Sequence, residues 1–341
     1  MIVFVHGLRN WGAVEEYVSA VVRGLRERGE DVALLYPDDA VLAPFAELGA
    51  TGGTFDLDAP GLTRRLRREL RLLRPAIVHA TDVFPQAQLA ARLAGVRRLF
   101  VTHHTPELPR RDNLAGRALQ RVGWLTRPEV VYTSQTDREA DGRRLRTHVV
   151  PLGIELDRFA SGRRVLNGRI VGNVARLAEQ KGHRDLLAAA PRVLERHPDV
   201  RFVVAGDGEL RAELELLAAP LGDRFEFLGE RRDVPDLLAS FEVFAFPSHF
   251  EGLCLAVIEA QAAGVAVVAT PVGGIRETVL EGETGFLVPV GDPQALAERI
   301  SWCLDNAEEA RRVAVEARGR VAAQFDVERM VAETLALYGI S

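Results

Sequence analysis

Two carboxylates flank the start of a predicted helix in the most informative stretch of the sequence, residues 246–260. An apolar strand ends at Pro247, a loop follows, and we expect the helix to begin near Gly252 or Leu253. The first amides of a helix have no partner within it and carry partial positive charge, so they can bind a phosphate without a metal. We expect this role for the amides near Gly252, Leu253 and Cys254.

Glu251 and Glu259, with seven residues between them, stand before and inside this helix. Glu251 is placed to reach toward a bound sugar, and the alternative is a helix-terminal acid that only stabilises the dipole. Glu259 is expected roughly two turns into the helix, where its carboxylate can accept hydrogen bonds from two hydroxyls, as a ribose offers. An acid among alanine, valine and isoleucine needs a partner, which favours a binding role.

A single lysine stands among the 43 basic residues of the chain, and the other 42 are arginine. Lysine is a compact point charge, whereas arginine is a wide planar fork. A chain that uses arginine nearly everywhere else therefore indicates that a compact ammonium is needed at Lys181. A phosphate oxygen in a tight site is the partner that such an ammonium fits.

These features resemble glycosyltransferase family 4, of the GT-B fold. The resemblance covers nearly the whole chain and is strongest from about residue 170 to 292. It implies a retaining, metal-independent enzyme that moves a hexose-type sugar from a UDP- or GDP-sugar to a hydroxyl acceptor, with UDP favoured and no cofactor. The motifs that carry it are the acid pair, the preceding Pro247-Ser248, the later Gly273-Gly274, and Gly285 to Val288.

The resemblance also gives roles to the residues around the predicted phosphate site. Arg176 and Lys181, five apart after a strand, are implied to clamp the donor diphosphate and to offset the charge that develops on it. Glu251 and the Gly273-Gly274 loop position the sugar, Glu259 holds the ribose, and the nucleobase rests near residues 229–232. The implied donor-binding residues of this half are Gly229, Arg231, Gly252, Leu253, Cys254, Glu259, Gly273 and Gly274.

In the first half, Gly12 and Ala13 lie between the first strand and the first helix and resemble the family's glycine-rich loop, with Ala13 replacing the second glycine. An ordinary strand-to-helix turn is the alternative. His104 follows the fourth strand, at the edge where open α/β sheets bind ligands. We expect it to contact a sugar hydroxyl or the acceptor, unless it is a structural or surface histidine. His6 and His79 also end strands, and His79 fits a strand-end role equally well.

Alternating strands and helices must position these residues. Apolar runs typical of buried parallel strands occur in both halves, with amphipathic helices between them, which predicts two Rossmann-like doubly wound domains facing a cleft. We expect an acceptor-binding domain over 1–155, a linker over 156–168, a nucleotide-sugar-binding domain over 169–322, and a terminal helix over 323–341 that packs back on the first domain. The expected strands are 2–5, 32–36, 77–78, 99–102, 130–133, 170–174, 200–205, 225–228, 243–246 and 265–269.

The composition of the chain indicates where in the cell the protein acts. The chain has 341 residues, two cysteines and no apolar run long enough to span a bilayer, so we expect a cytoplasmic enzyme without a signal peptide. Residues 1–165 carry a charge of +5 and the remainder −10. A basic helix over 64–74 indicates association with the inner face of a membrane, or arginines that are merely solvated around leucines packed on the sheet.

Several other functions agree less well with the motifs in the sequence. No G-x-G-x-x-G fingerprint and no P-loop follow a strand, which argues against a hydride-transfer cofactor. Nucleic-acid binding lacks a basic face with interleaved aromatic residues. A nucleotide-sugar epimerase of the same fold and a non-catalytic partner subunit remain as alternatives. The acceptor is open among a cell-envelope glycan, a glycolipid and a small metabolite.

Overall fold

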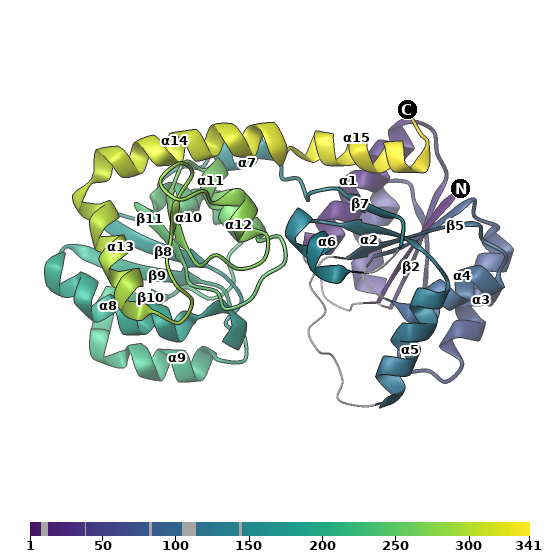
Figure 1. Cartoon of the computed structure of the whole chain (residues 1–341), viewed down its shortest axis with the longest axis horizontal. Helices are drawn as coiled ribbons and strands as arrows, with labels where there is room; N and C mark the ends of the chain where they lie inside the picture. Colours follow the sequence, from purple (N-terminus) through teal and green to yellow (C-terminus); the bar gives the residue numbers. More distant parts are fainter. Residues whose placement is uncertain (8–12, 38, 82–83, 104–113, 143–144) are drawn as a thin grey trace. The chain divides into compact units, whose positions relative to one another are not determined.

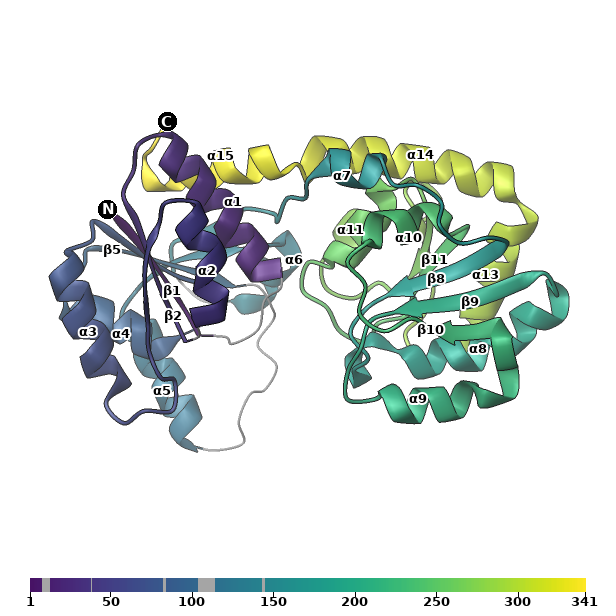
Figure 2. The same ribbon diagram turned by 180° about the vertical axis from the view of Figure 1, so that it is seen from behind.

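The computed structural model describes residues 1–7, 13–37, 39–81, 84–103, 114–142 and 145–341 (Figure 1). The chain forms two compact units. Unit 1 comprises Met1–Gly153 and Val327–Ser341, and unit 2 comprises Ile154–Asp326. Each unit contains one parallel β-sheet with helices on both faces, as the two views in Figure 1 and Figure 2 show.

The sheet of unit 1 has seven described strands in the order β3-β2-β1-β4-β5-β6-β7. Its central strands are buried on both sides, which is why continuous apolar runs predicted them. The strand order reverses between β1 and β4. The strands are β1 (Ile2–His6), β2 (Val32–Tyr36), β3 (Thr51–Thr54), β4 (Ile77–Thr81), β5 (Arg98–His103), β6 (Glu129–Tyr132) and β7 (Thr147–Val149). The helices are α1 (Ala13–Glu27), α2 (Asp39–Glu47), α3 (Leu62–Leu73), α4 (Pro85–Leu93), α5 (Leu114–Leu125), α6 (Gln135–Asp141) and α15 (Val327–Tyr338).

The sheet of unit 2 has six strands in the order β10-β9-β8-β11-β12-β13, and its order reverses between β8 and β11. Helices α8, α9 and α13 lie on one face, and α10, α11 and α14 lie on the other (Figure 2). The strands are β8 (Arg169–Val174), β9 (Val200–Ala205), β10 (Phe225–Phe227), β11 (Val243–Phe246), β12 (Ala266–Ala269) and β13 (Phe286–Leu287). The helices are α7 (Leu156–Ala160), η1 (Glu179–Lys181), α8 (His183–Arg196), α9 (Arg211–Ala218), η2 (Ala219–Arg224), α10 (Val234–Ser240), α11 (Leu255–Ala262), α12 (Ile275–Thr278), α13 (Pro293–Asp305) and α14 (Ala307–Gln324).

Three strands were not predicted, and all three lie at the edges of their sheets. β3 has the sequence Thr-Gly-Gly-Thr and is mostly exposed, β7 is half-buried, and β13 has two residues. An edge strand is covered less completely than a central one, so it needs no continuous apolar run. In β3 the glycine has a packing reason, because a Cβ at Gly52 would lie 3.2 Å from the side chain of Leu42 on α2.

The boundaries of the units differ in part from those predicted. Residues 156–168, expected as a linker, belong to unit 2 and contain α7, whose Phe159 side chain is buried. The chain returns to unit 1 after Asp326, between α14 and α15, rather than at residue 323. Helix α15 then packs against α1.

Helix α15 is held on unit 1 by polar contacts as well as by packing. The Nδ1 atom of His79 contacts the hydroxyl of Tyr338, and its Nε2 atom lies 2.5 Å from the hydroxyl of Thr102. Arg98 donates two hydrogen bonds of 2.7 Å to the last carbonyls of the helix, those of Leu337 and Tyr338. Burial lowers the pKa of His79 to about 3, so this histidine is a neutral structural residue.

We predict that His79 makes the stability of unit 1 depend on pH. Its folded-state pKa of about 3 lies below the ordinary 6.5. The stability that neutral His79 contributes is therefore fully present above about pH 6.5 and is lost as the pH falls toward 3. At about pH 5 we expect the free energy of unfolding to be about 2 kcal/mol lower than at about pH 7.5 because of this group alone.

The measurement is denaturant unfolding of wild type and His79→Gln in a Trp302→Phe background, so that Trp11 and Trp124 report on unit 1. The difference between wild type and variant should shrink by that amount on acidification. A difference that stays constant between the two pH values would show that His79 is not neutral in the folded state.

Candidate active site

The reversal of strand order in unit 2 sets two loops side by side. Strands β8 and β11 pair directly only at Val171 with Val243 and at Gly172 with Phe244. Beyond that point the Nδ2 of Asn173 donates a 2.7 Å hydrogen bond to the carbonyl of Ala245, in place of a backbone bond. In open α/β sheets, ligands bind at the carboxyl ends of strands where the order reverses.

Lys181 and Glu251 meet at this point. The Nζ of Lys181, in η1 after β8, lies 2.6 Å from the Oε1 of Glu251, in the loop after β11. The lysine side chain is 17% exposed and the glutamate side chain 8% exposed. The Nζ also lies 5.2 Å from the ring centroid of Phe246, where the π-face attracts a cation. Two residues predicted from their types alone are therefore in direct contact.

Ser248 fixes the glutamate, a role that sequence reasoning missed. Its buried hydroxyl lies 2.7 Å from the Oε1 of Glu251 and 2.7 Å from the carbonyl of Gln180. The amide of His249 donates a further 2.7 Å hydrogen bond to the same carbonyl. The loops after β8 and β11 are thus joined by backbone and side chain. A small hydroxyl residue three positions before the glutamate is the signal that points to this role.

Within this cluster the positive charge is carried by Lys181 and not by the neighbouring His183, which is neutral. His183 begins α8 and is buried, with its Nε2 3.2 Å from the Oδ1 of Asn173, so the ring donates to the amide oxygen. Burial, and to a smaller extent the charge of Lys181, lower the pKa of His183 to about 4. An anion bound near Lys181 would therefore be matched by the ammonium group and not by this imidazole.

Glycines allow the loops at this edge to touch through their backbones. Gly182 has φ +67°, and a Cβ there would lie 1.9 Å from the carbonyl oxygen of Pro247. Gly273, in the loop after β12, has φ +49°, and a Cβ there would lie 2.0 Å from the carbonyl oxygen of Glu251. The predicted Gly273-Gly274 loop thus packs directly on the backbone of the glutamate that it was expected to assist.

Helix α11 begins later than predicted, at Leu255, with Cys254 as its N-cap residue. The carbonyl of Gly252 accepts a 2.9 Å hydrogen bond from the amide of Gly274, which holds the chain outside the helix at that point. Glu259 is therefore the fifth residue of the helix, just over one turn in rather than two, and it is half-buried. The side chain of Cys254 makes no capping hydrogen bond to the first turn, and amides at a helix start can receive an anion.

The other predicted donor-binding residues of unit 2 lie on neighbouring loops. Arg176 follows β8, is exposed, and forms no ion pair with any residue in the described ranges. Gly229 has φ +70°, and its carbonyl accepts a 2.8 Å hydrogen bond from the amide of Gly206. Arg231 is paired with Asp233 through bonds of 2.8 and 2.5 Å, which holds the pKa of that carboxyl below its usual range. The structure gives no direct contact between these three residues and the Lys181–Glu251 pair.

The predicted residues of unit 1 are only partly described. Gly12 and His104 lie outside the described residues, and Ala13 is the first residue of α1. His6 is buried where the order of this sheet reverses, with its Nδ1 2.6 Å from the hydroxyl of Thr81 and its Nε2 2.9 Å from a carboxylate oxygen of Glu15. Both ring nitrogens of His6 therefore contact other residues of unit 1, which is a structural role.

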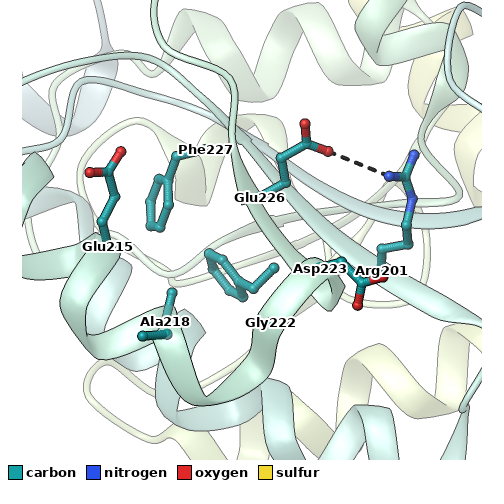
Figure 3. A pocket seen from close by; sticks show the side chains of 9 residues that line it. Arg201, Glu215, Ala218, Gly222, Asp223, Glu226 and Phe227 are labelled. Carbon is teal, nitrogen blue, oxygen red and sulfur yellow. Dashed lines mark hydrogen bonds and ion pairs between the residues drawn. The ribbon is translucent and has the colours of Figure 1, made fainter.

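A pocket of about 500 Å³ lies elsewhere in unit 2, beside the edge strand β10 (Figure 3). It lies at the amino ends of the strands, because η2 leads into β10 and Arg201 is the second residue of β9. Ligands of such sheets bind at the opposite ends, so we do not place the active site in this pocket. The labelled lining residues are Arg201, Glu215, Ala218, Gly222, Asp223, Glu226 and Phe227.

No cluster of three or more His, Cys, Asp or Glu side chains among the described residues could hold a metal ion. Within the same ranges, no helix combines the length and the apolar character that crossing a membrane requires.

Comparison with known proteins covers both units. The profile of Glycosyltransferase Family 4 matches residues 13–158, and that of Glycosyl transferases group 1 matches residues 168–306. A glycogen synthase of Mycobacterium tuberculosis is 30% identical over 292 residues, which cover 79% of this chain and 69% of that protein. A GDP-mannose-dependent alpha-(1-6)-phosphatidylinositol monomannoside mannosyltransferase of Mycolicibacterium smegmatis is 29% identical over 348 residues, 90% of this chain and 89% of that protein.

Solved structures show the same architecture. The crystal structure of HepE of Anabaena in complex with UDP matches with a TM-score of 0.83 and 23% sequence identity, over 98% of this chain and 99% of that one. The two parallel-sheet units and this similarity confirm the predicted GT-B fold. The chain spans a smaller part of three other curated relatives, namely 21%, 52% and 66% of their lengths.

We predict that Gly182→Ala destabilises unit 2 more than Gly264→Ala. Both glycines have a left-handed φ, +67° and +74°, but a Cβ at Gly264 meets nothing within 4 Å. The control should cost about 1 kcal/mol of unfolding free energy, from backbone strain alone. Gly182→Ala should cost at least about 2 kcal/mol more, because the loops after β8 and β11 must move apart. Denaturant unfolding followed through Trp302 measures both, and equal losses would mean that the two loops are not in contact.

Proposed function

Because the chain belongs to glycosyltransferase family 4 and is an enzyme of the GT-B type, we propose that it transfers a hexose-type sugar from a UDP- or GDP-sugar to a hydroxyl acceptor, with retention at the anomeric carbon. The observation that carries this proposal is the contact of Lys181 with Glu251 where β8 and β11 part. UDP is the favoured nucleotide, although the Mycolicibacterium relative is named as GDP-mannose-dependent, so both nucleotides are tested.

The donor diphosphate is held in unit 2 by positive charge without a metal. Lys181 supplies a compact ammonium, and the exposed guanidinium of Arg176 follows the same strand. The uncapped amides at the start of α11 supply a third positive group. Together they stabilise the charge that develops on the leaving diphosphate, which is the work that a divalent cation performs in other transferases.

Glu251 and the loop that contains Gly273 and Gly274 orient the donor sugar. Before the donor binds, the carboxylate of Glu251 neutralises Lys181, which keeps a buried and a half-buried charge paired. A diphosphate that takes over the ammonium frees the carboxylate of Glu251 to accept from a sugar hydroxyl, while Ser248 still holds its Oε1. Glu259 holds the ribose, and the backbone near residues 229–232 supports the base.

In the proposed mechanism retention follows because the acceptor hydroxyl bonds to the anomeric carbon on the same face from which the diphosphate leaves, and no dedicated base is needed. The departing diphosphate helps to remove the proton of the acceptor hydroxyl on the face from which it leaves. Unit 1 supplies the acceptor-binding residues, with His104 and the loop of Gly12 and Ala13 contacting a hydroxyl or a phosphate. A cell-envelope glycolipid is the first acceptor class to test, since the relative from Mycolicibacterium smegmatis is named as a phosphatidylinositol monomannoside mannosyltransferase. Glycans and small metabolites come next.

We expect Lys181→Ala to weaken donor binding about 10- to 100-fold, because a charge-assisted hydrogen bond contributes about 1.5–3 kcal/mol. Glu259→Ala should weaken binding of the same UDP- or GDP-sugar through loss of the ribose contacts. Calorimetry in EDTA measures both, and wild-type affinity should not change when the chelator is added. Arg184→Ala is the control, because Arg184 is three residues from Lys181 but pairs on the surface with Glu179 and Glu213. If no nucleotide sugar binds, or if neither substitution changes the affinity, the results would favour a role as a non-catalytic partner subunit.

We expect Glu251→Gln to separate sugar positioning from nucleotide binding. The amide keeps the size of the side chain but loses its charge, so turnover should fall about 10²- to 10³-fold. Affinity for the free nucleoside diphosphate should stay the same or rise, because the diphosphate no longer competes with a carboxylate for the ammonium of Lys181. Transfer assays with the donor found above, beside calorimetry with UDP, measure the two quantities. Release of an epimerised sugar without transfer to any acceptor would instead identify an epimerase.

A further inference from the structure

The hydroxyl of Ser248 has one proton and three acceptor oxygens within reach. Its Oγ lies 2.7 Å from the carbonyl oxygen of Gln180, 2.7 Å from the Oε1 of Glu251 and 3.2 Å from the carbonyl oxygen of Phe250. Carbonyl and carboxylate oxygens accept hydrogen bonds but do not donate them, and a serine hydroxyl donates once. One proton therefore serves two contacts of equal length, and Ser248 can donate fully to only one of the two oxygens at a time.

Each of these two oxygens has a second donor, and the two donors differ. The carbonyl of Gln180 also accepts a 2.7 Å hydrogen bond from the backbone amide of His249, which is part of the loop itself. The Oε1 of Glu251 also lies 2.6 Å from the Nζ of Lys181, the group that the proposed function assigns to the donor diphosphate. The carbonyl therefore keeps its second donor when a diphosphate binds, whereas the carboxylate loses its own.

The loss of Lys181 matters because the carboxylate is buried. Glu251 is 7% exposed, and Lys181 and Ser248 are the two donors to its side chain within the part of the chain that the structure describes. A buried carboxylate without a donor is costly, and more so than a carbonyl that keeps one of two hydrogen bonds. Once the ammonium has turned to a phosphate, the proton of Ser248 is therefore most stable on Glu251.

Ser248 can make this change without moving its heavy atoms. The residue is fully buried, and its carbonyl accepts a hydrogen bond from the hydroxyl of Thr270, which holds the backbone in place. Since the Oγ already lies 2.7 Å from both acceptors, rotation of the hydroxyl about the Cβ–Oγ bond is enough to redirect the proton. The hydrogen bond can thus change partners without any repacking.

We propose that Ser248 is a positioning residue that donates to Gln180 while Lys181 is bound to the carboxylate. When a diphosphate takes Lys181, the hydroxyl of Ser248 donates to Glu251 instead. Ser248 thereby lowers the free energy needed to separate Lys181 from Glu251, and it raises the affinity for a diphosphate although it is itself buried. The proposal rests on the proposed function, since a diphosphate must bind at Lys181 for the proton to change partners.

A serine that only joined the two loops would behave differently. It would stabilise them through its bond to Gln180, whatever side chain stood at position 251. Removal of the hydroxyl would then change the nucleotide affinity equally with a carboxylate or an amide at that position. The proposed change of partner instead makes the effect of Ser248 depend on the negative charge of Glu251.

The test is a double-mutant cycle of S248A and E251Q, with the affinity for UDP and GDP measured by calorimetry in EDTA. The free nucleotide carries no sugar, so Glu251 enters the measurement only through Lys181. We expect S248A alone to weaken binding about tenfold, the size of one hydrogen bond to a charged group. In the E251Q background the same substitution should change the affinity less than about threefold, because a neutral amide loses less without that bond.

Ser240 provides the matched control, because it is also fully buried in unit 2 but its hydroxyl bonds only to backbone groups among the described residues. It accepts from the amides of Val165 and Leu166 and donates to the carbonyl of Asp236. S240A should leave the affinity within about threefold of wild type. Thermal unfolding of each variant establishes that it is folded. If S248A does not fold, S248C takes its place in the cycle, since a thiol is only a weak donor.

Equal losses of affinity in the two backgrounds would overturn the proposal and leave the proposed function intact, since the nucleotide would still bind. An unchanged affinity of S248A beside an intact Glu251 would overturn it as well. If wild type binds neither UDP nor GDP, the proposed function fails, and the change of hydrogen-bond partner fails with it.

Discussion

The parting of β8 from β11 is the constraint on which the candidate active site depends. Where the two strands cease to pair, a backbone carbonyl would be left without a donor, and the side chain of Asn173 supplies one. The loops that leave this point meet at once, through Lys181 and Glu251 and through the glycine that lets Pro247 approach. The ammonium and the carboxylate that we propose to bind the phosphate and the sugar are thus neighbours because the order of the strands reverses between them.

The elements that were predicted correctly from the sequence are those that show one clear physical signal in it. Central strands such as β2, β9 and β11 are buried on both faces, so their apolar runs stand out. Edge strands lack that signal, and β3 is held by pairing with β2 and by glycine packing instead. The start of α11 was misplaced because it is set by a hydrogen bond between Gly252 and Gly274, residues that are far apart in sequence.

The same distinction applies to the site. Lys181 stands out by composition and Glu251 by its place before a helix, so both could be found without a structure. Asn173 and His183 could not, because their roles consist of contacts with residues on other strands. Ser248 is marked in the sequence only by its spacing from Glu251, and its contact with Gln180 needed the structure. Histidines were the least predictable group. His79 was predicted to end a strand, where a ligand contact is expected, yet it lies in the middle of β4, and its ring is in the core and holds the last helix. Its position in the sequence alone does not distinguish these roles.

That last helix also bears on how the protein is made. Unit 2 is a single continuous segment, whereas unit 1 joins the first 153 residues to the final 15. The partner of His79 is Tyr338, which leaves the ribosome 259 residues later. Until then the imidazole lacks its Nδ1 partner, although Thr102 still contacts its Nε2, and the face of α1 that packs against α15 is uncovered. The half of the enzyme whose synthesis begins first therefore lacks its last helix until all of unit 2 has been synthesised.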